Sequence, residues 1–309
     1  MSDLIEEKLK AFASTTILHP AYEKSIKKIL HSIYVSNIRG EASSTILLGD
    51  PGTGKTTLCE HLVNIIGTPI SVSDEHGEYL NIPALFCSIP ADCASKRLAM
   101  EILKGLCSTD GVHRNTVLVH RILTRLTTCK TKVIILDELQ HLLSKGAEKT
   151  LENLCNWVKD LINTSHLPII LVGTPNCERI VDAHPQLARR YPFRARLKNL
   201  ELNSEFQTVL TVLIGEMIRI GELQAEIFIT DKATTKIFYA FSGGNFGALC
   251  VLLREIFQCA LERSKNTLTR DDCVAGLDGL DLPPFLPLPG NAFTLPPQVI
   301  NNLLSRHSP

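Results

Sequence analysis

The sequence predicts an α/β fold, in which a mainly parallel sheet core is followed by a small unit made only of helices. Up to about residue 202, short apolar runs typical of buried strands alternate with stretches of helical periodicity. This alternation is the pattern of a parallel sheet with connecting helices. Beyond residue 202, apolar residues recur only at helical spacing, as in the stripe formed by Phe206, Leu210 and Leu213.

Length and composition narrow the class of protein. The chain has 309 residues, which suits one α/β domain and a smaller second domain. Its formal net charge is zero, so a strongly basic surface must be local. No apolar run is long enough to span a bilayer, and we expect neither a membrane span nor a secretory leader. The ten cysteines include no C-x-x-C pair, which argues against zinc and for the reduced, buried thiols of a cytoplasmic protein.

The expected elements follow in order along the chain. We expect a helix over residues 21–38, a strand over 44–48, a helix from residue 57, and a loop or hairpin over 70–81. A strand over 82–89 leads to two helices, at 95–107 and 116–127. Strands over 132–137, 167–173 and 193–200 complete the sheet, with a helix over 147–162 between the first two.

The same pattern divides the chain into four parts. Residues 1–40 are an N-terminal helical extension, residues 41–202 are the α/β core, and residues 203–280 are a helical lid. Residues 281–309 form a tail in which prolines recur from Pro283 to Pro297. Proline excludes a regular helix or a central strand through that stretch, so we expect an extended, mobile arm.

A phosphate-binding motif joins the first strand to the next helix. Residues 49–56 read G-D-P-G-T-G-K-T and match the P-loop pattern at every fixed position. Glycines let the backbone N–H groups point at phosphate oxygens, Lys55 is placed to reach the β- and γ-phosphates, and the Thr56 hydroxyl to ligate Mg²⁺. The alternative is a chance match in a glycine turn, against which the flanking strand and helix argue. The candidate ATP-binding residues are Gly49, Asp50, Pro51, Gly52, Thr53, Gly54, Lys55, Thr56 and Thr57.

A second motif supports a nucleotide site. Residues 132–136 form an apolar run that ends in Asp137 and Glu138, as a buried parallel strand would. Open α/β sheets bind ligands at the carboxyl ends of their strands. Asp137 there would hold Mg²⁺, and Glu138 would orient or deprotonate the attacking water. An acidic turn after a strand is common by itself, but together with a complete P-loop it predicts an ATPase.

Further segments narrow the class to one family. They are L-H-P-A-Y at 18–22, I-P-A-L at 82–85, D-E-L-Q-H-L-L at 137–143, V-G-T-P at 172–175, Q-L-A-R-R-Y-P-F at 186–193 and S-G-G-N at 242–245. Over about residues 15–265 this series resembles the TniB/TnsC family of AAA+ transposition regulators, which is related to MuB. The P-loop and the Asp-Glu pair are generic to AAA+ proteins, whereas the Arg-Arg-aromatic-Pro-Phe box is more specific.

The resemblance implies a function. Such proteins bind ATP and Mg²⁺, oligomerise as rings or filaments on double-stranded DNA, and recruit a DDE transposase of the TnsB/TniA type. A selector similar to TniQ or TnsD chooses the target site. The resemblance therefore implies an ATPase in the bacterial cytoplasm, on the nucleoid when DNA-bound. We expect its hydrolysis to be slow and to be stimulated by DNA or partners.

The resemblance also implies roles for residues outside the two phosphate motifs. Thr174 would be the sensor of the γ-phosphate, with Asn176 as the fallback; the alternative is a threonine that merely ends a strand. Arg189 or Arg190 would be the arginine finger that reaches a neighbouring subunit's ATP and offsets charge on the γ-oxygens. The alternative for this pair is a solvated surface.

A basic segment between the phosphate motifs is a candidate DNA surface. In the resembling family this region faces the pore of the ring, so Lys96, Arg97, Lys104 and Arg114 become candidate contacts to DNA phosphates. Phosphate contacts position a protein without reading sequence, so we expect non-specific binding. On charge alone, these residues would be a solvated helix face.

One departure from the AAA+ pattern leaves alternatives open. Many AAA+ lids carry an arginine shortly after a Gly-Asn pair, but here Gly244-Asn245-Phe246 is followed by Gly247. Arg254 lies two helical turns further on and is a poor substitute by spacing. The chain could therefore be a scaffold that assembles with ATP but turns it over little. A further alternative is an AAA+ ATPase of another DNA pathway, similar to a helicase loader.

Overall fold

In the computed structural model, residues 3–15, 17–74, 77–91, 95–108, 115–143, 148–226, 231–263 and 266–307 are described. The chain divides into two compact units. The first, which we call the core unit, comprises Ala21–Leu197. The second, the helical unit, comprises Met1–Pro20 together with Lys198–Pro309. Each unit is described by itself below.

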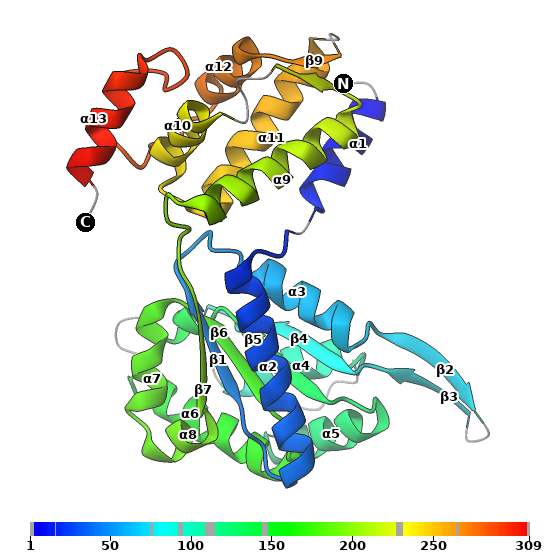
Figure 1. Ribbon diagram of the computed structural model, residues 1–309. Helices are drawn as coiled ribbons and strands as arrows, with labels where there is room; N and C mark the ends of the chain where they lie inside the picture. Colours follow the sequence, from blue (N-terminus) through cyan, green and yellow to red (C-terminus); the bar gives the residue numbers. More distant parts are fainter. Residues whose placement is uncertain are drawn as a thin grey trace. The chain divides into compact units, whose positions relative to one another are not determined.

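A five-stranded parallel sheet forms the centre of the core unit (Figure 1). Its strands in spatial order are β4 (Ala84–Ser88), β5 (Val133–Asp137), β6 (Ile169–Gly173), β1 (Thr45–Gly49) and β7 (Phe193–Leu197). All four neighbouring pairs are parallel, so the carboxyl ends of the strands share one edge. This edge therefore collects the residues that follow β1, β5 and β6.

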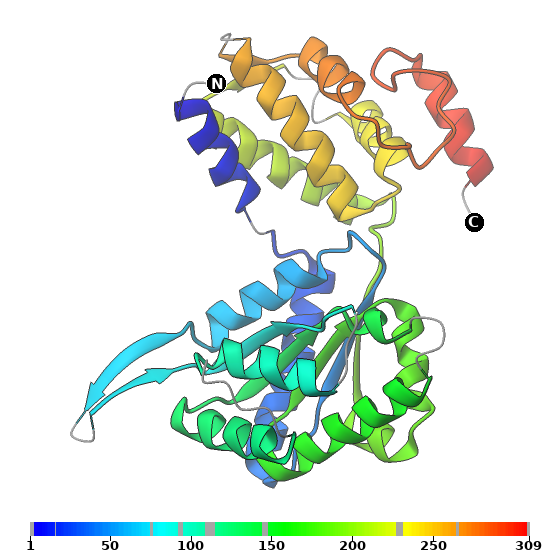
Figure 2. The ribbon, with the colours of Figure 1, turned by 180° about the vertical axis from the view of Figure 1, so that it is seen from behind.

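Helices cover both faces of the sheet, because alternate strand residues point to opposite sides. Leu47 and Ile135 pack with α2 (Pro20–Arg39) and α3 (Lys55–Ile66). Leu48 and Ile134 pack on the other face, which Figure 2 shows in front. The helices on that face are α4 (Ser95–Gly105), α5 (Asn115–Thr128) and α6 (Glu148–Ser165), with the short α7 (Glu178–Asp182) and α8 (Pro185–Arg190). The predicted α/β class is thereby confirmed.

Residues 70–81 form a separate two-stranded hairpin, one of the two outcomes expected from the sequence. Strand β2 (Ile70–Asp74) pairs antiparallel with β3 (Gly77–Asn81). The ribbon projects from the core unit in both views (Figures 1 and 2). Lys130 holds its base, because its ammonium lies 4.3 Å from the centroid of the Tyr79 ring.

The helical unit has its own apolar core. Phe206 and Phe257 are fully buried at its centre, and Phe12 of the first helix packs edge-on against Phe257 with ring centroids 5.3 Å apart. The helices are α1 (Asp3–Ala13), α9 (Ser204–Gly221), α10 (Lys232–Ser242), α11 (Phe246–Glu262), α12 (Arg270–Asp278) and α13 (Pro297–His307). A small parallel pair, β8 (Gln224–Ala225) and β9 (Thr267–Leu268), joins them.

The two ends of the chain differ from the expectations. Residues 1–40 are not one extension, because α1 packs in the helical unit whereas α2 belongs almost entirely to the core unit. The tail is not an extended arm, because Phe293 and Ile300 are buried in the helical core. No helix spans residues 281–296, as the prolines require, but Pro297 begins α13, since proline is compatible with the first turn of a helix. Lys236 of α10 donates to Asn301 of α13 at 2.6 Å.

Within the described residues, no single helix is both long and apolar enough to cross a membrane. The adjacent α10 and α11 reach that length and apolarity only as a pair, and the chain bends by 115° between them. Their apolar residues form part of the core of the helical unit.

Candidate nucleotide site and basic surface

The P-loop follows β1 and curls through two left-handed glycines. Gly52 and Gly54 have φ angles of 77° and 83°, a region that other residues enter only with strain. Helix α3 begins at Lys55, and no side chain caps its N-terminus. The first N–H groups of this helix therefore have no side-chain acceptor, which is the arrangement that binds a phosphate.

Tyr22 of α2 supports the P-loop through hydrogen bonds from its hydroxyl group to the loop backbone. Its side chain is completely buried, and its hydroxyl group lies 2.8 Å from the carbonyl oxygen of Gly54 and 3.2 Å from that of Thr53. A Cβ atom on Gly54 would lie 1.4 Å from this hydroxyl oxygen, so only glycine fits. The sequence places Tyr22 in the L-H-P-A-Y segment but gives no signal of this contact.

Two side chains of the loop, those of Lys55 and Thr53, donate to the loop's own carbonyl oxygens. Lys55 Nζ donates to the carbonyl oxygens of Gly49 at 2.8 Å and Asp50 at 3.1 Å, two partners that a phosphate oxygen can replace. Thr53 closes the turn by donating to Asp50 O at 2.8 Å. Lys55 is thus held at the position where the motif requires a cation.

Thr56 and Asp137 meet at the shared edge of the sheet. The Thr56 hydroxyl donates to Asp137 Oδ2 at 2.8 Å, and the Asp137 side chain is only 3 % exposed. Both groups are hard oxygen donors of the kind that Mg²⁺ prefers. The donor set therefore fits Mg²⁺.

Glu138 follows Asp137 in an unusual backbone conformation. Its φ angle is 64°, and its N–H donates to Asp137 Oδ1 at 2.7 Å. A left-handed non-glycine residue costs about 1–2 kcal/mol, and such strain gathers at functional sites. The carboxylate is 38 % exposed and accepts a hydrogen bond from Gln140. The neighbouring His141 directs Nδ1 to Ile89 O at 2.6 Å.

Thr174 lies between the two phosphate motifs. It follows β6, the strand that pairs with both β1 and β5, so it stands at the same sheet edge. Its Oγ1 lies 3.6 Å from Cys177 Sγ. Burial raises the pKa of the Cys177 thiol, and the contact with Thr174 partly opposes that rise. Asn176, the fallback sensor, accepts a hydrogen bond from Arg179 at 2.7 Å.

The two finger candidates lie at the opposite edge of the sheet. Arg189 and Arg190 end α8, just before the amino end of β7. Arg190 forms an ion pair with Glu41, which precedes β1. Arg189 is exposed, and the described part of the chain offers it no ion-pair partner. The structure therefore distinguishes two residues that the sequence left equivalent.

Comparison with known proteins decides the family. The family model described as bacterial TniB protein matches residues 10–200. The chain belongs to the bacterial TniB family. The resemblance seen in the sequence is thereby confirmed, although no curated protein matches this TniB chain.

Solved structures show the fold of this TniB chain to be that of AAA+ P-loop ATPases. Aeropyrum pernix ORC1 in complex with DNA has a TM-score of 0.62 and 14 % identity, with 88 % of this chain and 68 % of that chain covered. Aeropyrum pernix ORC2 with ADPNP and ADP has a TM-score of 0.61 and 15 % identity, covering 85 % and 70 %. The Thermotoga maritima RuvB Holliday junction branch migration motor has a TM-score of 0.50 and 18 % identity, covering 84 % and 70 %.

The basic segment of this TniB chain lies on α4 and α5. Arg97 and Lys104 are exposed on α4 and stand two turns apart on the face opposite the buried Leu98 and Ile102, while Lys96 is half-buried. Lys104 lies 4.0 Å from Glu101. Arg114 lies outside the described residues.

Two further arginines of this segment support the chain itself. Arg121 donates to Ser108 Oγ at 2.9 Å, and Arg125 donates to Leu106 O at 2.7 Å. Both bonds tie α5 to the end of α4. These two cations are therefore engaged within the chain.

The glycines and asparagine of the lid motif shape a turn between α10 and α11. Gly243 ends α10 with a φ angle of 58°, and Asn245 caps α11 by accepting from the N–H of Ala248 at 3.0 Å. A Cβ on Gly244 would lie 1.8 Å from Leu200 O. Arg254 donates to Ala13 O at 3.2 Å, so this TniB chain uses that arginine to hold the end of α1.

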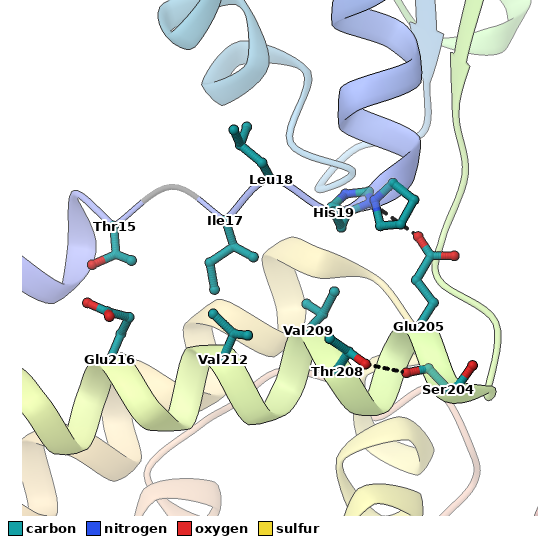
Figure 3. Close-up of a pocket in the computed structure, with 11 residues that line it drawn as sticks. Thr15, Ile17, Leu18, His19, Ser204, Glu205, Thr208, Val209, Val212 and Glu216 are labelled. Atoms are coloured by element: carbon teal, nitrogen blue, oxygen red, sulfur yellow. Dashed lines mark hydrogen bonds and ion pairs between the residues drawn. The ribbon is translucent and has the colours of Figure 1, made fainter.

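A groove of about 600 Å³ runs along α9 in the helical unit (Figure 3). Ile17, in the segment between α1 and α2, points toward Val212 of α9 across it, whereas the Leu18 side chain points away from α9. His19 lies at one end, 4 % exposed, with Nδ1 3.6 Å from Glu205 Oε1. Burial lowers the pKa of His19, and Glu205 opposes that effect.

Proposed function

We propose that this chain is an ATP-dependent regulator of DNA transposition. It binds ATP with Mg²⁺, assembles on double-stranded DNA, and recruits a transposase of the DDE class to a site chosen by a TniQ- or TnsD-like selector. Membership of the TniB family supports the transposition role, and the structure of ORC1 with DNA supports DNA as a partner of this fold. The observation that carries the proposal is the meeting of Lys55, Thr56, Asp137 and Glu138 at one edge of the sheet.

The residues at that edge have separable roles. The uncapped start of α3 and Lys55 bind the phosphates, and Thr56 with Asp137 holds Mg²⁺. Bound Mg²⁺ neutralises charge on the phosphate oxygens. Glu138 orients the attacking water and accepts its proton. Thr174 is the sensor residue that contacts the γ-phosphate.

The site is completed by a second copy of the chain. Arg189 stands at the amino end of β7, whereas the P-loop stands at the carboxyl end of the neighbouring β1, so Arg189 cannot serve the P-loop of its own core unit. An exposed arginine there can complete the site of an adjacent subunit. We therefore propose Arg189 as the arginine finger and Arg190 as a residue that stabilises the core unit through Glu41.

Two variants test the proposal. Lys55→Ala removes the phosphate cation and should leave a monomer without ATP, as measured by light scattering with and without DNA. Glu138→Gln keeps Asp137 but removes the base, so ATP-bound oligomers should persist on DNA while phosphate release falls at least roughly tenfold. DNA-bound oligomers of Lys55→Ala, or undiminished release by Glu138→Gln, would contradict the proposal.

An ATP-gated scaffold with little turnover is the second candidate. Gly247 stands where many AAA+ lids carry an arginine, and Arg254 is engaged with Ala13. Phosphate release in the presence of DNA separates the two functions. The scaffold predicts that wild type and Glu138→Gln release phosphate equally slowly.

A further inference from the structure

The turn that follows β5 brings a glutamine amide onto the carboxylate of Glu138. We propose that Gln140 is a positioning residue for hydrolysis: it anchors one oxygen of Glu138 and leaves the other free to accept a proton from water. This inference rests on the proposed role of Glu138 as the base. Gln140 stands in the single-turn helix η1 (Leu139–Leu143), two residues beyond Glu138.

The two carboxylate oxygens of Glu138 differ in their contacts. Oε2 accepts a hydrogen bond from Gln140 Nε2 and lies 3.8 Å from His141 Nε2. Within the described residues, Oε1 has no hydrogen-bond partner. One oxygen is thus restrained and the other is available, which is the arrangement that a general base needs.

The amide of Gln140 is enclosed at its oxygen end, and Oε1 has no hydrogen-bond partner within the described residues. Its Oε1 is buried against the end of β6, where a Cβ atom on Gly173 would lie only 3.2 Å away. Glycine at position 173 therefore leaves the space that this amide fills. With Oε1 directed at the strand, Nε2 is the end of the amide that faces Glu138.

The backbone of the turn fixes the glutamine further. His141 N donates to Glu138 O at 3.0 Å, and His141 Nδ1 donates to Ile89 O at 2.6 Å. Ile89 N in turn donates to Asp137 O at 2.9 Å. The turn is thus tied to the ends of both β4 and β5, so Gln140 acts from a rigid support.

Without this hydrogen bond, Glu138 would have a half-exposed carboxylate free to rotate away from the water. Loss of orientation lowers the rate of the chemical step and leaves substrate binding intact. Gln140→Leu should therefore lower kcat by about tenfold, the loss typical of one hydrogen bond to a charged group. KM for ATP should stay within about threefold, because the amide of Gln140 donates its hydrogen bond to Glu138 and not to the P-loop.

A matched control exists on α11. Gln258 Nε2 also donates to a glutamate, Glu262 Oε1, at 2.9 Å, but in the helical unit. Gln258→Leu removes the same kind of bond and should leave kcat unchanged. Gln140→Glu provides a second variant of nearly equal size, in which an acceptor faces Glu138; it should also lower kcat even where Gln140→Leu fails to fold.

Combination with Glu138→Gln tests whether Gln140 acts through the base. If it does, adding Gln140→Leu to Glu138→Gln should change kcat by less than about twofold, because coupled residues are not additive. Wild-type or higher kcat in folded, ATP-binding Gln140→Leu, or a multiplied loss in the double variant, would overturn the positioning role. An unchanged rate in Glu138→Gln alone would instead overturn the proposed base, so the two failures are distinguishable.

Discussion

Thr56 donates its hydroxyl hydrogen to Asp137 across 81 residues of sequence, at a distance of 2.8 Å. The bond joins the first turn of α3 to the last residue of β5, and so unites the two phosphate motifs. The other carboxylate oxygen of Asp137 accepts the N–H of Glu138 at 2.7 Å. A divalent cation that displaces the Thr56 hydrogen bond would meet two oxygen ligands already in place.

Removal of the charge of Asp137 should therefore weaken Mg²⁺ binding. In Asp137→Asn, the side chain keeps its size but offers a neutral oxygen or an amide donor to the cation. Phosphate release at fixed Mg²⁺ should fall at least roughly tenfold, the low end of the loss seen when even an outer partner of a metal site is removed. A Mg²⁺ titration of phosphate release measures this, and part of the loss should recover at high Mg²⁺. The exposed Asp160→Asn on α6 is the charge-matched control.

The motifs of this site were predictable because each is a contiguous segment with a fixed chemical requirement. The P-loop needs glycines at left-handed positions, and Gly52 and Gly54 have that conformation. Tyr22 and Gln140 were missed because they act by contact and not by motif: Tyr22 reaches Gly54 across 32 residues. The contacts of Tyr22 and Gln140 can be recognised only in the folded structure, in which α2 and η1 are packed against the site.

In the tail, residues 281–309, the proline content predicts local conformation but not burial. Prolines from Pro283 to Pro296 correctly exclude a helix there, but they say nothing about burial. Phe293 and Ile300 are buried because α10 offers them an apolar surface, as the edge-on contact of Phe238 with Phe293 at 5.3 Å shows. Such surfaces are created by the fold and carry no periodic signal in the tail itself.

The contrast between Arg189 and Arg190 gives a second prediction. Arg189→Ala should bind ATP and assemble but hydrolyse slowly, because an arginine finger supplies about 10³-fold or more in rate. Arg190→Ala should keep the chemistry and lower the thermal stability, since it leaves Glu41 without its ion pair. Phosphate release and a thermal melt of both variants measure the difference.

Mixing of subunits shows whether Arg189 acts on a neighbour. Arg189→Ala keeps its own base, and Glu138→Gln keeps its own arginine. In a mixture, some interfaces join ATP bound to an Arg189→Ala subunit, which keeps Glu138, to Arg189 of a neighbouring Glu138→Gln subunit. Such a site has both the base and the arginine. The mixture should therefore hydrolyse ATP faster than either variant alone. If the mixture hydrolyses ATP no faster than the two variants do separately, Arg189 is not the arginine finger.

The lysines of α4 give a third prediction, on DNA. Neutral replacements of Lys96 and Lys104 should weaken binding to unrelated duplexes alike, because phosphate contacts do not read sequence. The logarithm of affinity falls with the logarithm of salt by about 0.9 per neutralised phosphate, so the variant should show a shallower slope. Binding of ATP by the free protein should survive. A double replacement of Lys24 and Lys27, exposed on α2, is the charge-matched control, and an unchanged slope in the α4 variant would locate the DNA surface elsewhere.

His19 gives a prediction on pH. Burial lowers the pKa of His19 in the folded protein, and the nearby Glu205 carboxylate only partly opposes this. The unfolded chain takes up the proton near pH 6.5, whereas the folded chain does so only at lower pH, so protons favour unfolding in between. Stability from neutral His19 is therefore complete above pH 6.5, declines as the pH falls, and levels off at the folded pKa. Thermal midpoints from pH 8 to pH 5 should fall less steeply in His19→Gln than in wild type. In Glu205→Gln the decline should extend to lower pH, because the carboxylate that supports the protonated imidazole is gone. Parallel curves for wild type and His19→Gln would show that another group carries the dependence.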